Sequence, residues 1–221
     1  MPKIQINLEG WQDYRGAESG VLLYVESSHQ TAIPVRDQLN ENGKGHFYEP
    51  NYETSTWGLS SCCSAKAINA AIKAKNRYLL FGTRYEGFNT EFRNRFIIMG
   101  YQQIEKIRDL RSRHLQHFLA SGCAEESECI ALDRIMATWG PMRFVSLEDS
   151  FVLTDDQIKA WGLRGRASRQ LKLTLTGEPL SQVLAHLSSK TDRIDDYIAT
   201  VEELKAALDE DDESEAVNES A

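Results

Sequence analysis

The chain has 221 residues, of which 41% are hydrophobic and 26% are charged, and its formal net charge is -8. This composition excludes a fibrous or wholly disordered protein, and the length favours one domain with an appendage. No stretch reaches the roughly 18 uninterrupted apolar residues of a membrane helix, and residues 1–10 lack the apolar segment of a secretory signal. We therefore expect a cytoplasmic or nuclear protein without a membrane partner.

The acidity is distributed unevenly along the chain. Residues 190–221 contain 12 acidic and three basic side chains, whereas residues 66–113 contain 11 basic and four acidic ones. Because a basic segment attracts polyanions even in an acidic protein, the net charge does not exclude nucleic acid as a partner. We expect residues 209–221 to be a disordered acidic tail that competes with nucleic acid for the basic surface.

The first predicted elements are strands around one helix. The apolar run 21–25 predicts a buried strand, and residues 40–55 are typical of a loop. Ser61 or Ser64 can cap a helix that runs to about Lys75. Two further strands are then expected at 77–83 and 95–104, joined by a hairpin-like connection.

The second half of the domain is predicted to be more helical. Helical patterns lie near 106–119 and 127–137, and 141–147 returns to a strand. Thr154 is expected to cap a short helix that ends at Gly162, with two aspartates in its first turn.

A stripe of mainly apolar residues at alternating spacings of four and three follows over residues 180–208. This pattern is typical of one or two amphipathic helices, with Thr191 as an internal cap. Such helices can dock on the domain or bind a second copy or another helical partner. We therefore divide the chain into a globular domain at 1–178, an amphipathic helical extension at 179–208 and the acidic tail at 209–221.

Motifs for catalysis, phosphate loops or paired carboxylates are absent, so no catalytic residue or cofactor is predicted. Cys62 and Cys63 at a helix start, with His29 or His46 as a base, leave an enzymatic alternative open. The cysteines and histidines between His114 and Cys129 do not have the spacing of a zinc site, and we predict no metal.

Aromatic and basic side chains form the richest constellation. The aromatic residues are Trp57, Trp139, Tyr85 and Phe88. The basic residues around them are Lys66, Lys73, Lys75, Arg77, Arg84, Arg93, Arg95 and Arg143. Basic groups contact phosphates and aromatic faces hold unstacked bases, although core tryptophans beside a solvated basic surface give the same pattern. A second, weaker basic cluster lies at 163–169.

The stretch T-W-G-L-S-S-C-C-S-A-K-A-I-N-A-A-I-K-A-K-N-R-Y-L-L-F-G-T-R-Y-E-G-F, residues 56–88, resembles the centre of the YTH family. In this comparison residues 66–72 match the family's helix pattern, residues 78–81 its strand and residues 86–88 its turn. Residues 98–101 resemble the next strand, and residues 23–29 resemble the strand and polar loop that open the domain. The resemblance covers about residues 21–153.

The resemblance implies a PUA-like α+β fold, a small mixed β-barrel flanked by helices, as in the related EVE and ASCH domains. It further implies recognition of a modified base, which is N6-methyladenosine in RNA for YTH domains. Trp57 would be the first wall of an aromatic cage and Trp139 the second. Ser27, Ser28 and His29 would line the edge of the pocket.

These observations favour a non-enzymatic reader that binds RNA or DNA and inserts one flipped or single-stranded base, methylated or plain, near Trp57. The alternatives are a nucleotide- or base-modifying enzyme that uses Cys62, Cys63 or His29, and an assembly protein that acts through residues 180–208.

Overall fold

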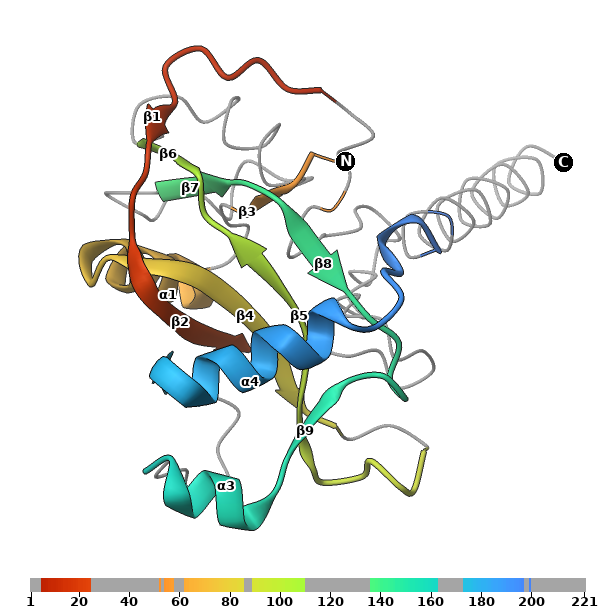
Figure 1. Ribbon diagram of the computed structural model, residues 1–221. Helices are drawn as coiled ribbons and strands as arrows, with labels where there is room; N and C mark the ends of the chain where they lie inside the picture. Colours follow the sequence, from red (N-terminus) through yellow and green to blue (C-terminus); the bar gives the residue numbers. More distant parts are fainter. Residues whose placement is uncertain are drawn as a thin grey trace, which may run out of the picture.

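The structure is a computed structural model, and it shows a mixed α+β fold built on two β-sheets (Figure 1). The described residues are 5–24, 52, 54–57, 62–85, 89–109, 136–162, 173–196 and 199, with the backbone alone described at 24, 62–67 and 173. The strands in these ranges do not close a barrel. Within the same ranges, no helix combines the length and the apolar character needed to cross a membrane.

The larger sheet has six strands. Five of them have the order β10-β2-β4-β5-β8, and β9 pairs with the N-terminal half of β5. Its strands are β2 (Ala17–Tyr24), β4 (Asn76–Arg84), β5 (Phe96–Gln103), β8 (Met142–Phe144), β9 (Phe151–Leu153) and β10 (Leu173–Thr176). The central pair β2 and β4 is parallel, and the other pairs are antiparallel. The antiparallel β4–β5 pair confirms the hairpin expected from the sequence.

The smaller sheet has the strand order β1-β6-β7-β3. Its strands are β1 (Gln12–Asp13), β3 (Thr56–Trp57), β6 (Lys106–Asp109) and β7 (Met136–Trp139). Two residues separate β5 from β6 and two separate β7 from β8, so these segments pass directly from one sheet to the other. Gly140 lies in the second corner, where a Cβ atom would be only 1.9 Å from the carbonyl oxygen of Gln103.

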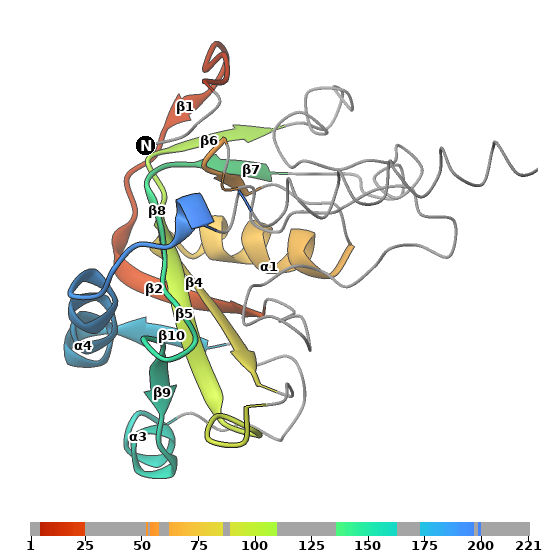
Figure 2. The same cartoon turned by 90° about the vertical axis from the view of Figure 1, so that its right-hand side faces the viewer.

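Helices cover both faces of the central strands. Helix α1 (Cys62–Lys73) and helix α4 (Gly177–Ser188) lie on opposite sides of β2 and β4 (Figure 2). Side chains along β4 alternate between the two cores, so that Leu79 and Phe81 pack on the α1 side, and Leu80 packs on the α4 side. This double burial explains the continuous apolar run in β4, since a strand covered on both faces has no solvent side.

The start of helix α3 (Asp155–Ala160) confirms the predicted cap. The Thr154 hydroxyl accepts a hydrogen bond from the backbone N–H of Gln157, and the Gln157 side chain accepts one from the backbone N–H of Thr154. These reciprocal bonds satisfy two amide groups that the first helical turn leaves without partners. Gly162 follows the helix with φ +68°, the left-handed conformation that favours glycine after a helix.

The helices predicted near 106–119 and 127–137 are wrong where the structure describes them. Residues 106–109 form β6 and residues 136–139 form β7, and these two strands pair with each other in antiparallel register. The pairing joins residues about 30 positions apart, and such long-range contacts override a local helical pattern. The parts of the two segments between residues 109 and 136 lie outside the described residues.

Helix α4 docks on the larger sheet. It buries Leu180, Val183 and Leu187, three residues of the apolar stripe predicted over 180–208. The guanidinium group of Arg143 donates hydrogen bonds to the carbonyl oxygens of Leu187, at 2.8 Å, and Lys190. The helix therefore contacts the domain through both its apolar face and its C-terminal carbonyl groups. Residues 200–208 and the acidic tail lie outside the described residues.

Candidate nucleic-acid interface

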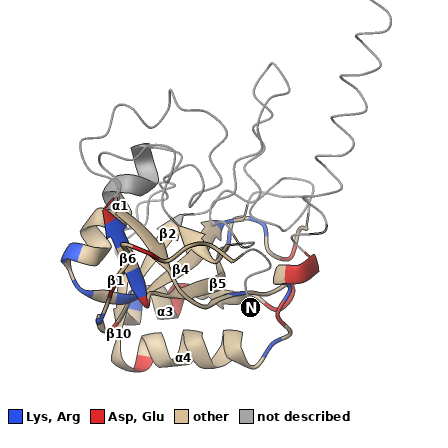
Figure 3. Cartoon of the chain, turned by 90° about the horizontal axis from the view of Figure 1, so that it is seen from above, with Lys and Arg blue, Asp and Glu red and all other residues tan. Residues whose placement is uncertain are grey.

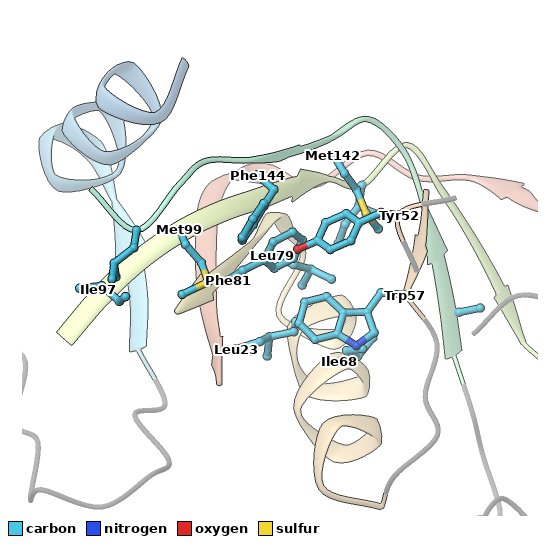
Figure 4. Packing of buried hydrophobic residues seen from close by; sticks show 14 of the residues in the cluster. Leu23, Tyr52, Trp57, Ile68, Leu79, Phe81, Ile97, Met99, Met142 and Phe144 are labelled. Atoms are coloured by element: carbon cyan, nitrogen blue, oxygen red, sulfur yellow. The ribbon is translucent and has the colours of Figure 1, made fainter. Parts of the chain in front are cut away.

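Trp57 is part of the main hydrophobic core. Its side chain is 1% exposed, and its ring centroid lies 5.0 Å from that of Phe81, with the rings edge to face. Figure 4 shows the indole between Leu23, Phe81 and Ile68 of α1. The ring thus offers no open face to a base in this structure.

The two tryptophans proposed as cage walls point to opposite faces of the smaller sheet. Trp57 pairs with Thr138, and Trp139 pairs with Thr56. Directly paired residues of an antiparallel ladder share a face, and neighbours along a strand alternate. The Trp57 ring therefore lies on the core side of the β3–β7 pair and the Trp139 ring on the other side, so the two rings do not face each other.

A buried polar network holds the backbone next to Trp57. The Thr138 hydroxyl lies 2.6 Å from Oε1 of Gln102 and 3.0 Å from the carbonyl oxygen of Trp57. Nε2 of Gln102 donates a 2.9 Å hydrogen bond to the carbonyl oxygen of Ser55. Gln102 and Thr138 are fully buried, and each buried polar group of this kind needs a partner. The network fixes the register of β3 against β7.

The indole Nε1 of Trp57 is a buried donor without a hydrogen-bond partner in the described part of the chain. Ser55, two residues earlier, has φ +56°, a backbone conformation that is costly for a serine. The segment that carries Trp57 therefore combines a strained backbone at Ser55 with a buried polar group, the indole N–H, inside an apolar core.

Trp139 lies at the end of β7 and is partly exposed. In the ladder it pairs with Lys106 of β6, which in turn pairs with Asp13 of β1. These three side chains consequently form one row on the face of the smaller sheet that does not contain Trp57. A partly exposed indole beside a cation is a surface on which an aromatic base can stack.

Basic side chains from three segments converge at the adjacent end of the fold. We call this set the basic edge, and it comprises Arg15, Lys73, Lys75, Arg77, Lys106 and Arg108. Figure 3 shows lysine and arginine positions along β6 and near the end of α1. Five acidic residues, Glu9, Asp13, Glu18, Glu105 and Asp109, are interspersed, so the basic edge has an excess of one positive charge.

Tyr14 joins the segments of the basic edge. Its backbone N–H donates a 2.7 Å hydrogen bond to the carbonyl oxygen of Glu105, and its hydroxyl donates a 2.9 Å bond to the carbonyl oxygen of Asn76. Nζ of Lys75 lies 5.9 Å from the centre of the Tyr14 ring. Burial raises the pKa of the Tyr14 phenol above its usual range. One buried tyrosine therefore places three basic segments side by side.

Two acidic side chains of this region form ion pairs with the basic edge. Arg77 pairs with Glu18, and Nζ of Lys106 lies 2.5 Å from Oδ1 of Asp13. The hydrogen bond and charge of Lys106, with the charge of Arg15, hold the pKa of Asp13 below its usual range. Both acids are exposed, so a stronger anionic ligand can replace them.

A second group of predicted phosphate-binding residues lies at the other end of β4. Arg84 ends β4, and Arg93 and Arg95 precede β5 in the connecting turn. Arg84 lies seven positions after Arg77, a distance of about 23 Å along an extended strand. Nε of Arg84 is buried without a hydrogen-bond partner among the described residues. The predicted phosphate-binding residues therefore divide between two distant places.

Tyr85 and Arg143 have structural contacts. Tyr85 is 4% exposed and packs edge-on against Phe92, with ring centroids 6.4 Å apart, so it stiffens the β4–β5 turn. The Arg143 guanidinium is occupied by the carbonyl groups at the end of α4. The remaining predicted residues lie outside the described side chains: Ser27, Ser28, His29, Phe88, Lys66, Cys62, Cys63 and the 163–169 cluster.

The sequence analysis missed Arg15, Lys106 and Arg108 as interface residues. Lys106 and Arg108 were placed in a predicted helix, whereas in β6 they share the face that carries Trp139. The alternation Lys106-Ile107-Arg108 is the signal that could have found them. No group of three or more metal-binding side chains occurs within the described ranges.

Comparisons with known proteins give no information on the function of the chain. No protein-family model, curated protein or solved structure matches the chain.

Proposed function

We propose that the chain is a non-enzymatic nucleic-acid-binding module. The observation that carries the proposal is that Tyr14 joins three chain segments which together carry six cations, and that one of these, Lys106, pairs in the ladder with the partly exposed Trp139. Cations in such an arrangement contact successive phosphates, while an aromatic ring takes a base. The ligand is RNA or DNA with at least one unpaired or flipped base.

The proposal includes a PUA-like fold, which rests on the resemblance to YTH and EVE domains. The direct passage of β5 into β6 and of β7 into β8 supports it, because strands that continue between two sheets form the wall of a partly open barrel. Along the chain, α1 follows Trp57 of β3 and precedes β4, and this order agrees with the order of elements in the resemblance.

Recognition of a modified base is the finer part of the proposal. A methylated base inserted beside Trp57 would have to displace the residues that now cover the ring, whereas Trp139 is already partly exposed. Oligonucleotides with and without N6-methyladenosine test this part. If Trp57 lines the base site, Trp57→Phe reduces discrimination between the two oligonucleotides more than it reduces binding of the plain one.

The basic edge gives the main test. We expect Lys75→Gln and Arg108→Gln each to weaken binding of a labelled single-stranded oligonucleotide and to reduce the salt slope by about 0.7. The matched control is Lys159→Gln, an exposed lysine on α3 outside the basic edge. Fluorescence anisotropy over a salt series measures both quantities. Equal binding by all four proteins, wild type included, would exclude the basic edge as the phosphate-contacting surface.

A further inference from the structure

The face of the smaller sheet that carries Trp139 leads to a more specific inference, which rests on the proposed function. Thr56 and Ala137 on this face are buried, whereas Asp13, Lys106 and Trp139 are partly or fully exposed. Asp13, Lys106 and Trp139 occupy one row across β1, β6 and β7. Arg108 shares this face two residues beyond Lys106. The row therefore places an aromatic ring, a cation and a carboxylate next to one another in that order.

The carboxylate of Asp13 forms an ion pair with the ammonium group of Lys106. Oδ1 of Asp13 lies 2.5 Å from Nζ of Lys106, at the place where a phosphate oxygen would bind the same ammonium group. The Asp13 side chain is 84% exposed and that of Lys106 is 29% exposed. Because exposed ion pairs are weak, a ligand that brings both a phosphate and a stacking base competes well for Lys106.

We propose that Trp139 and Lys106 form a binding site for one unpaired nucleotide, in which the base stacks on the indole and the phosphate replaces Asp13 on Lys106. The site selects single-stranded nucleic acid, since the bases of a duplex do not expose their faces. Asp13 sets the affinity, because each binding event must first release its ion pair.

Three variants separate the parts of this site. The probe is a labelled oligopyrimidine DNA of about 12 nucleotides, compared with the duplex of the same sequence. We expect Trp139→Ala to weaken single-strand binding by about five- to a hundredfold and to leave duplex binding nearly unchanged. Trp139→Phe keeps a stacking surface and should retain most of the affinity. Trp161→Ala, a partly exposed tryptophan next to α3, is the matched control.

Asp13→Asn is the decisive variant, since it alters an exposed side chain and should fold normally. It frees Lys106, so we expect single-strand affinity to rise about twofold to fivefold. The salt slope should steepen by about 0.7, as one more cation becomes available to phosphate. In Lys106→Gln the Asp13→Asn change should have no further effect, because the competing pair no longer exists.

The outcomes distinguish this site from the function on which it rests. Binding that Trp139→Ala does not weaken, or an affinity that Asp13→Asn does not raise, overturns the site and leaves the basic edge as the general phosphate-binding surface. A wild-type chain that binds neither probe at about 50 mM salt overturns the proposed function and the site together.

Discussion

The two faces of the smaller sheet differ in how deeply their tryptophans are buried. On the core side, Trp57 and Thr138 are almost fully buried, and the polar groups beside them are held by a network through Gln102. On the other side, Trp139 and Lys106 are partly exposed, and Lys106 forms an ion pair with the exposed carboxylate of Asp13. Adjacent positions of one ladder thus have different environments, and the parity of the register decides which residue packs in the core and which one is available for the binding that we propose.

Gly140 lies at the corner after β7, the strand that carries both Thr138 and Trp139. Its substitution has the largest expected effect on the free energy of unfolding. A Cβ atom at Gly140 would meet the Gln103 carbonyl oxygen at 1.9 Å, and the backbone N–H of Gly140 bonds to Ser55. We expect Gly140→Ala to destabilise the protein by about 4 kcal/mol or more, or to prevent folding. Gly162→Ala, where no atom of the described residues lies within 4 Å of the new Cβ, should cost only about 1 kcal/mol. Similar urea midpoints for the two variants would contradict the tight corner.

The tryptophans give the direct comparison between the faces. Trp57→Ala removes a buried ring and should cost about 3–5 kcal/mol of unfolding free energy, whereas Trp139→Ala should cost about 1 kcal/mol. Urea denaturation followed by circular dichroism measures both. The comparison fails if Trp139→Ala is the more destabilising of the two.

Thr138 tests the polar part of the core side. Thr138→Val keeps the shape of the side chain but leaves Oε1 of Gln102 without its 2.6 Å partner, so we expect a loss of about 1–3 kcal/mol. Thr174→Val, at an exposed position of β10, should change stability by less than about 0.5 kcal/mol. Denaturant titration of the two variants side by side shows whether the hydroxyl of Thr138 is needed.

Tyr14, the buried residue that joins the segments of the basic edge, gives the smallest effect, and this effect depends on pH. Its pKa is raised by burial, so the stability linked to the neutral phenol is fully present below the unfolded value near 10 and is lost as pH rises through the folded value. Tyr14→Phe should cost about 1 kcal/mol at neutral pH through the lost bond to Asn76. It should also lose less stability than wild type above pH 10. Tyr78, whose pKa burial also raises, contributes to the alkaline loss that remains. An unchanged alkaline slope in thermal melts would show that Tyr14 does not titrate in this range.

Local signals in the sequence were sufficient for part of the fold. The apolar runs of β4 and β5 and the Thr154 cap are decided by neighbours along the chain, and each was predicted correctly. Strands β6 and β7 were not, because their pairing joins segments that a local pattern cannot connect. The short strand β10 was also missed, although its alternation of Leu and Thr is typical of a strand.

The candidate site was predictable in composition but not in geometry. The excess of basic residues between 66 and 113 was visible in the sequence, and so were the two tryptophans. Which tryptophan faces outward depends on the pairing of Trp57 with Thr138, and a shift by one residue would exchange their environments. Similarly, Arg143 has the same charge as Lys106, and only tertiary structure shows that it is engaged by α4.

The contacts that hold α4 and the following segment on the larger sheet can form only late in the synthesis of the chain. The backbone N–H of Arg193 bonds to the carbonyl oxygen of Phe144, so the segment after α4 covers the free edge of β8. This cover and the apolar face of α4 leave the ribosome after the strands that they cover. Until then Leu22, Leu80 and Ile98 have no helix over them, and the edge of β8 is open to pairing with another nascent chain. Residues 177–193 therefore close two surfaces, an apolar face and a strand edge, that the earlier strands leave open.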